Sequence, residues 1–134
     1  MGVERVNPEG MYDSLGYGFS HAAISTGGRQ LHLAGQVAWD ANHGLVGGAD
    51  LGAQARQVFA NLRAVLASQG AGPADLLRLR TYVVGHRPDK IGIVAAEMMA
   101  FYGDAVPAPN TWIGVETLAL PEFLIEVEGV AQLP

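Results

Sequence analysis

The sequence of 134 residues predicts one α+β domain, in which a mixed β-sheet carries two helices packed on one of its faces. The predicted elements follow the order strands, helix, strand, helix, two strands. Each helical segment has one apolar stripe, and both stripes are buried if the two helices lie on the same face of a sheet. No internal repeat, low-complexity tract or long linker divides the chain, so residues 1–134 are predicted to form a single domain.

The first third of the chain is predicted to be mostly extended. Residues 3–6 form an edge strand, and residues 18–25 and 29–38 form a β-hairpin that turns at residues 26–28. The second of these strands alternates between apolar and polar side chains: Leu31, Leu33 and Val37 against Gln30, His32 and Gln36. This alternation is typical of a strand with one buried face. Residues 40–48 are predicted to be a loop.

Both helices are predicted from their spacing and their caps. The first begins after Asp50, which can cap its first turn, and ends at Gly70. Its stripe consists of Leu51, Ala55, Val58, Phe59, Leu62, Val65 and Leu66. The second is opened by Pro88 and Asp89 and stopped by Gly103. Its stripe consists of Ile91, Val94, Ala95, Met98 and Phe101.

The remaining strands are residues 76–84 and a terminal hairpin within residues 108–131. In the first, Leu77, Leu79, Thr81 and Val83 are predicted to share one face, opposite Arg78, Arg80 and Tyr82. In the hairpin, Trp112 is assigned to the face that carries Glu126 and Glu128. The helix-free face of the sheet is therefore predicted to be part polar, with Gln36, Arg80, Trp112, Glu126 and Glu128 on it.

The composition favours an oligomer that covers this face. Charged residues make up 16% of the chain, against about 25% in an average soluble protein, and hydrophobic residues make up 49%. A symmetric assembly would bury part of this apolar surface and leave polar sites at its seams. The alternative is a compact monomer whose 18 glycines depress the charged fraction.

Several functional classes are disfavoured by composition. The absence of cysteine excludes disulfides, cysteine nucleophiles and cysteine-ligated metal sites. A net charge of -5 with only 8 lysines and arginines argues against a nucleic-acid partner. No metal site or cofactor is expected, because the four histidines show no ligand spacing. No signal sequence or apolar run of 18 residues occurs, so we expect a cytoplasmic protein without a membrane partner.

Three stretches carry a family signal: LHLAGQVAWD, QARQVFANLRAVLASQGAGPADLLRLRTYVV and LIEVEGVA. Together they resemble the Rid/YjgF family, the reactive intermediate imine deaminases, some of which are named L-PSP endoribonucleases. The resemblance covers residues 17–132 and implies a chorismate-mutase-like fold and a homotrimer with clefts between subunits. It also implies hydrolysis of small enamines and imines, with an arginine fork on the substrate carboxylate and a glutamate that positions the attacking water.

The family's site residues carry over only in part. Glu126 matches the catalytic glutamate, Gly35 the pocket glycine, and Phe19 an aromatic residue of the pocket. The arginine falls on Trp112, and a cysteine two residues later falls on Gly114. Residues 88–134 contain no arginine. Losing a charge-assisted pair typically costs about two orders of magnitude in affinity, so a standard 2-imino acid is predicted to be handled poorly.

Two functions remain open from the sequence. In the first, a Rid-like homotrimer binds and hydrolyses a small apolar or aromatic enamine or imine, with Trp112 and Phe19 as stacking surface and Glu126 holding the water. In the second, a non-enzymatic trimer binds a metabolite or a protein partner in the same clefts, and Trp112 anchors the interface. Endoribonuclease action is disfavoured by the acidic balance. Arg78 and Arg80 either supply charge to a cleft or form interface salt bridges.

Overall fold

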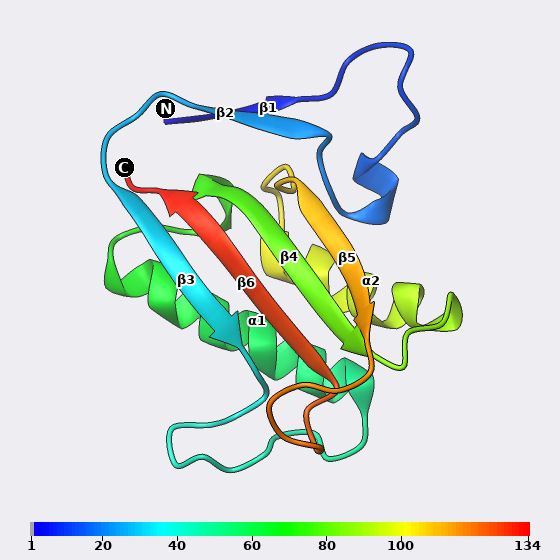
Figure 1. Ribbon diagram of the computed structural model, residues 1–134. Coiled ribbons are helices and arrows are strands. Elements are labelled where there is room, and N and C mark those ends of the chain that lie inside the picture. The colour runs from blue at the N-terminus through cyan, green and yellow to red at the C-terminus, as the bar shows by residue number, and fades with distance from the viewer. Residues whose placement is uncertain (1) are drawn as a thin grey trace.

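A four-stranded mixed sheet forms the centre of the protein, and two helices cover one of its faces, as the computed structural model of residues 2–134 shows (Figure 1). The elements in chain order are β1 (Val3–Val6), a 3-10 turn η1 (Leu15–Tyr17), β2 (Ala22–Ser25), β3 (Gln30–Gln36), α1 (Leu51–Ser68), a 3-10 turn η2 (Pro73–Asp75), β4 (Leu76–Val84), α2 (Asp89–Tyr102), β5 (Asn110–Val115) and β6 (Ile125–Gln132). The predicted α+β class with two helices on a mixed sheet is confirmed.

The strand order of the main sheet is β3-β6-β4-β5. β6 runs antiparallel to both of its neighbours, and β5 runs parallel to β4. A parallel pair needs a crossover connection, and α2 supplies it. The core lies between the sheet and the two helices, where Val58, Leu62 and Leu66 of α1 are fully buried.

β1 and β2 form a separate antiparallel ribbon that stands over the end of the sheet where β4 begins (Figure 1). Arg5 fastens this ribbon to the domain. Its Nε donates to the carbonyl of Val106 at 3.1 Å, its Nη2 to that of Ala74 at 3.2 Å, and its Nη1 to that of Leu76. One guanidinium thus joins the N-terminal strand to two distant segments.

Both predicted hairpins are wrong. β2 pairs with β1, whereas β3 pairs with β6. The chain passes between the two sheets through Gly27 and Gly28, whose φ angles of 91° and 96° suit glycine. β5 and β6 do not pair either, because β4 lies between them. In each case pairing with a strand distant in sequence replaces pairing with the next strand along the chain.

The first helix agrees with its prediction. Asp50 caps it by accepting a hydrogen bond from the backbone N–H of Ala53 at 3.1 Å. Gln54 is fully buried in its first turn: its Nε2 donates to the carbonyls of Gly48 and Glu122, and its Oε1 accepts from the N–H of Leu124. These bonds tie the connection before β6 to the helix.

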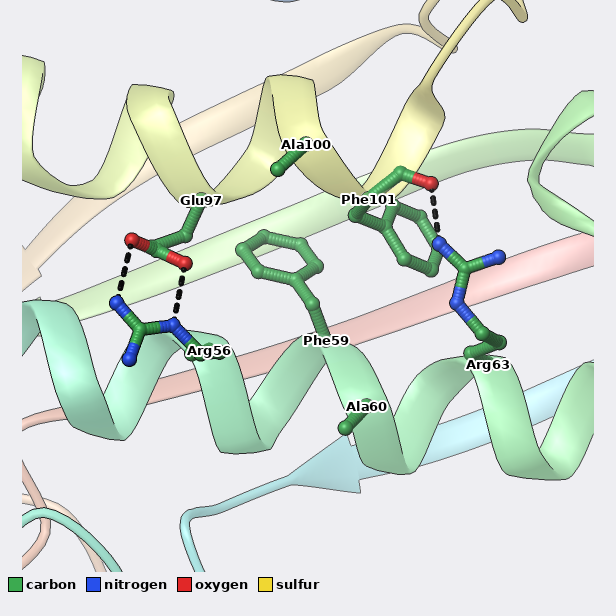
Figure 2. Close-up of a pocket in the computed structure, with 7 residues that line it drawn as sticks. All are labelled: Arg56, Phe59, Ala60, Arg63, Glu97, Ala100 and Phe101. Atoms are coloured by element: carbon green, nitrogen blue, oxygen red, sulfur yellow. Dashed lines mark hydrogen bonds and ion pairs between the residues drawn. The ribbon is translucent and has the colours of Figure 1, made fainter.

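The second helix also forms where predicted, and its outer surface meets that of α1. Ile91 is an exception to the predicted stripe, since it is exposed. A shallow hollow of about 210 Å³ lies between the two helices (Figure 2). Arg56 and Glu97 form an ion pair across it at 3.0 Å, and the Arg63 guanidinium donates to the carbonyl of Phe101. All of its cationic and anionic groups are therefore paired.

Candidate functional site

The helix-free face of the sheet gathers polar side chains from all four strands of the main sheet, and we call it the polar face. Its members follow from the register, because directly paired residues project to the same side of a sheet. Three rows cross the strands: Glu126, Tyr82 and Ile113; Glu128, Arg80 and Thr111; and His32, Val130 and Arg78. The predicted grouping of Arg78, Arg80 and Tyr82 on one face agrees with this register.

Glu126 of β6 lies against the backbone of β3 at Gly35. A β-bulge separates Leu33 from Gln36 in this strand, and Gly35 lies within it. A Cβ built on Gly35 would overlap Oε2 of Glu126 and lie 2.7 Å from its Cδ. The missing side chain at position 35 therefore makes room for the carboxylate. The structure brings together two residues that the resemblance had placed in one pocket.

Burial raises the pKa of the Glu126 carboxyl above its ordinary value of 4.5, and the charge of nearby Glu128 raises this pKa further. Glu128 itself accepts a hydrogen bond from the hydroxyl of Tyr82. This bond raises the pKa of Tyr82, while neighbouring Arg80 acts in the opposite direction. Two carboxylates and a phenol thus form a compact acidic group, in which Glu126 is the member without a side-chain donor among residues 2–134.

Phe19 lies beside the two arginines of the polar face. A hollow of about 180 Å³ is lined by Phe19, Ser20, His21, Arg78, Leu79, Arg80, Pro109, Asn110 and Thr111. A larger hollow of about 480 Å³ flanks Arg78 on the side of the ribbon and includes Ser25, Gln30 and His32. Phe19 is therefore grouped with Arg78 and Arg80 within one chain.

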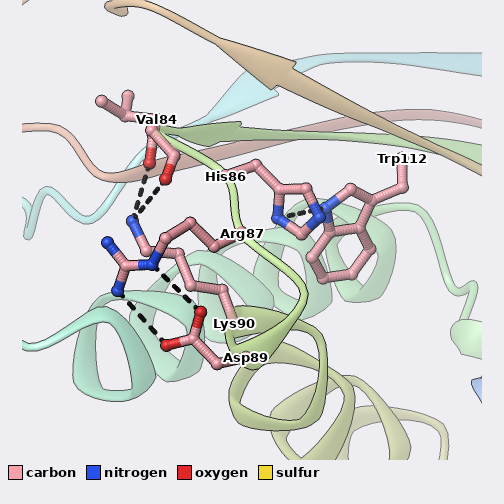
Figure 3. A network of polar contacts seen from close by, with 7 residues as sticks. Val84, His86, Arg87, Asp89, Lys90 and Trp112 are labelled. Atoms are coloured by element: carbon pink, nitrogen blue, oxygen red, sulfur yellow. Dashed lines mark hydrogen bonds and ion pairs between the residues drawn. The ribbon is translucent and has the colours of Figure 1, made fainter.

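Trp112 lies on the opposite face, so its predicted position beside the carboxylates is wrong. It pairs with Thr81, which is fully buried beneath the helices. Its ring packs against the core, and its Nε1 donates to Nδ1 of His86 at 3.2 Å (Figure 3). Gly114 shares this face, since a Cβ there would lie 3.0 Å from Cβ of His86.

Trp112 was assigned to the wrong face because β5 was given the wrong partner strand. The prediction paired β5 with β6 in a hairpin, whereas β5 pairs with β4 in parallel, and a shift of one residue exchanges the two faces of a strand. Thr111 and Ile113 take the places on the polar face. The ligand roles assigned to Trp112 and Gly114 stay predictions, and a ligand of those residues would lie on the side of the sheet away from Glu126.

Figure 3 also shows how the segment before α2 is held near Trp112. Nζ of Lys90 donates to the carbonyls of Val84 and Gly85, each at 3.0 Å. Arg87 forms an ion pair with Asp89 at 3.1 Å. These contacts hold the loop that carries His86 in place, and its Nδ1 is thereby positioned to accept the hydrogen bond from the indole of Trp112.

Two bulges account for the other differences in side-chain direction. Gln36 follows the bulge in β3, pairs with buried Val127 and faces the helices, whereas the alternation had placed it on the polar face. A second bulge in β4 lies between Leu76 and Arg78. Leu76 therefore takes the core position predicted for Leu77, which instead lines the larger hollow. A single extra residue in a strand leaves no clear trace in sequence alternation.

Within residues 2–134, no group of three or more His, Asp or Glu side chains is arranged to hold a metal ion. In the same part of the chain, no helix has the length and apolar character needed to cross a membrane.

Comparison with known proteins defines the class of this chain. The family model described as endoribonuclease L-PSP matches residues 15–133. The RutC family protein PH0854 of Pyrococcus horikoshii is 32% identical over 106 residues, which cover 78% of this chain and 79% of the relative. The crystal structure of YyfB, a Rid protein of Yersinia pestis, is 56% identical and superimposes with a TM-score of 0.97, covering 99% of this chain and 100% of the other.

The chain therefore belongs to the Rid family, and the resemblance inferred from the sequence is confirmed. The crystal structure of Escherichia coli TdcF with bound serine has a TM-score of 0.70 at 17% identity, covering 80% of this chain and 83% of that one. At this identity the likeness shows a common fold.

Proposed function

We propose that this protein hydrolyses a small enamine or imine on the polar face, with Glu126 as the general base. The observation that carries the proposal is the position of the Glu126 carboxylate, part-buried against Gly35 with a raised pKa. A perturbed carboxylate that lacks a side-chain donor is typical of an acid–base group. Family membership supports the same reading.

The proposed chemistry needs one water molecule and no cofactor. Glu126 accepts a proton from the water as the water oxygen bonds to the carbon of the C=N group, and it then passes this proton to the nitrogen. In the resulting carbinolamine the hydroxyl proton moves to the nitrogen as the C–N bond breaks, so ammonia leaves and a carbonyl compound remains. A raised pKa favours this role, because a base works best when its pKa approaches the working pH. Glu128, held by Tyr82, keeps the negative charge of the site high.

We further propose that the active form is a homotrimer whose subunits meet over the polar face. Exposed apolar side chains in the N-terminal segment support an assembly, among them Tyr12, Tyr17 and Ile24 of β2. In such an assembly Glu126, Gly35 and Phe19 would line seams between neighbouring chains. Trp112 and Gly114 are left out of the proposed site because they lie on the helix-bearing face.

The decisive experiment measures imine hydrolysis by the purified protein and by Glu126→Gln. Imines are generated in the assay by an amino-acid oxidase from one aliphatic and one aromatic amino acid, and the release of ammonia is followed. We expect Glu126→Gln to lower the rate by at least about 100-fold, the usual contribution of a general base. Glu116→Gln, a change at an exposed glutamate outside the face, is the matched control and should leave the rate unchanged.

A wild-type rate in Glu126→Gln would refute the role of this carboxylate. An absence of hydrolysis by the wild-type protein on both imines, with ligand binding retained, would instead support a non-enzymatic binding protein. RNA cleavage that survives extensive purification would support the endoribonuclease reading.

A further inference from the structure

We propose that the outer face of α2 is a contact surface for a second copy of this chain, with the two helices antiparallel. Helical spacing places six exposed, uncharged residues on this face, opposite buried Val94 and Met98: Gly92, Ile93, Ala96, Met99, Ala100 and Gly103. The helices lie on the side of the sheet away from the polar face (Figure 1). The contact is therefore separate from the proposed site and from the proposed trimer.

The outer face of α2 is apolar and carries no free charge. Ile93 is 45% exposed and Met99 is 38% exposed, whereas a helix face that meets water normally carries charged and polar side chains. Residues 91–103 contain one charged side chain, that of Glu97. Figure 2 shows Glu97 turned towards α1, where it pairs with Arg56 at 3.0 Å. A continuous exposed apolar surface of this kind is typical of an interaction site.

The sizes of these side chains fit an antiparallel copy of the same helix. When Ala96 faces Ala96 of the partner subunit, helical spacing sets Ile93 against Ala100 of the partner subunit and Met99 against Gly92 of the partner subunit. A two-fold axis through the two alanines repeats each contact. One face thus supplies both the projecting side chains and the spaces that receive them, and the small residue at the crossing allows the helix axes to approach to about 8 Å.

The charges at the two ends of α2 select the antiparallel direction. Its N-terminal end carries Arg87 and Lys90 against one acid, Asp89, while its C-terminal end is followed by Asp104, which forms no ion pair within residues 2–134. The helix macrodipole adds to this difference, because its positive end lies at the first turn. An antiparallel copy sets each basic end beside an acidic end. This charge complementarity favours a second copy of the chain over an unrelated apolar partner.

The small size of the face predicts a weak contact. A helix of 14 residues is about 21 Å long and about 10 Å wide, so its footprint is roughly 200 Å², well below the roughly 800 Å² per partner of a standard interface. Gly18 borders the face on one side, since a Cβ built there would lie 3.4 Å from Sδ of Met99. We therefore expect association at about 100 μM and above, and none at a few micromolar.

A cysteine cross-link tests this contact, because the chain contains no cysteine of its own. Ala96→Cys places one thiol at the two-fold axis, where two copies in contact bring their thiols within reach of a disulfide. In the matched control Ala100→Cys, the same packing leaves the thiols about 12 Å apart along the helix axis, beyond that reach. With diamide as the oxidant and about 200 μM protein, Ala96→Cys should form a dimer of chains on a non-reducing gel at least about tenfold faster than Ala100→Cys.

Three substitutions in the Ala96→Cys background show which surface the cross-link uses. Ile93→Glu should slow it by at least about tenfold, because each contact would then bury unpaired carboxylates. Thr117→Glu, at an exposed position outside α2, should leave the rate unchanged. Ile113→Glu should also leave it unchanged, because Ile113 lies on the polar face. The last variant separates this contact from the proposed trimer.

Four results would overturn the proposal. They are no cross-linking of Ala96→Cys, equal rates in Ala96→Cys and Ala100→Cys as a parallel pair would give, a rate that Ile93→Glu leaves unchanged, or a cross-link that Ile113→Glu abolishes. Each substituted residue of α2 is exposed, so we expect every variant to fold, and thermal unfolding checks this. A wild-type rate of imine hydrolysis in Ile93→Glu would show that the proposed reaction does not depend on this contact.

Discussion

Glu126 lies where it does because position 35 carries no side chain. The sequence indicated both residues through the resemblance, but their contact depends on a bulge in β3 that alternation does not reveal. Arg78 and Arg80 were placed on the correct face by alternation along one strand. That neither forms an ion pair within residues 2–134 could not be predicted, since it depends on which strands lie on either side.

Gly35→Ala should move the Glu126 carboxylate away from β3, because the new methyl group would occupy its position. We expect hydrolysis to fall by about tenfold or more, with a loss of about 0.5–1.5 kcal/mol of stability for an altered side-chain rotamer. Enzyme kinetics and urea unfolding measure the two effects. Gly72→Ala is the control, since the space around Gly72 is open. Equal rates in the two variants would contradict the proposed role of the contact.

Stability should depend on pH through Glu126. Its pKa is higher in the folded protein than its ordinary value, so the folded state holds this proton more tightly than the unfolded chain does. The free energy of unfolding therefore falls as the pH rises from the ordinary pKa of 4.5 through the raised folded value. At a pH below both pKa values Glu126 is protonated in the folded and in the unfolded state, so it no longer makes the free energy of unfolding depend on pH.

Glu126→Gln removes this ionisation, so the variant should gain stability relative to the wild type as the pH increases. The gain should stay below about 1 kcal/mol, because the carboxylate is part-exposed and its charge is screened. Urea unfolding at several pH values measures it, with Glu116→Gln as the control. A constant difference in stability across the pH range would contradict the raised pKa.

At the scale of elements, the sequence predicted helices better than strand partners. Helix α1 was found from its stripe and the Asp50 cap, both of which are local signals. β5 was found as a strand but given the wrong neighbour, because pairing is decided by contacts far apart in the chain. This one error put Trp112 on the wrong face.

Trp112→Phe should lower the free energy of unfolding by about 1 kcal/mol, since it removes the hydrogen bond to His86 and keeps an aromatic ring against the core. Hydrolysis should be unchanged, because the ring lies on the face away from Glu126. Trp112→Arg should destabilise the protein more and give no gain on carboxylated imines. Urea unfolding and the ammonia assay test these statements, and a gain of activity in Trp112→Arg would contradict the assigned face.

At the scale of the whole molecule, two features favour assembly: the low fraction of charged residues, and the apolar side chains that remain exposed on the surface. We expect sedimentation velocity at micromolar concentration to give three times the mass of one chain. Ile113→Glu should shift this assembly toward monomers, because Ile113 lies on the polar face in the row of Glu126. Thr117→Glu, outside the sheet, is the control. A monomeric wild-type protein would refute the proposed trimer.

The amide of Gln54 separates the turn at residues 116–121 from the start of β6. It forms hydrogen bonds with the backbone of Glu122 and Leu124, immediately before β6, the strand that carries Glu126. Insertions or deletions at residues 116–121 lie before these hydrogen bonds, so they need not move β6. Designed insertions in this turn should therefore leave the position of the Glu126 carboxylate unchanged.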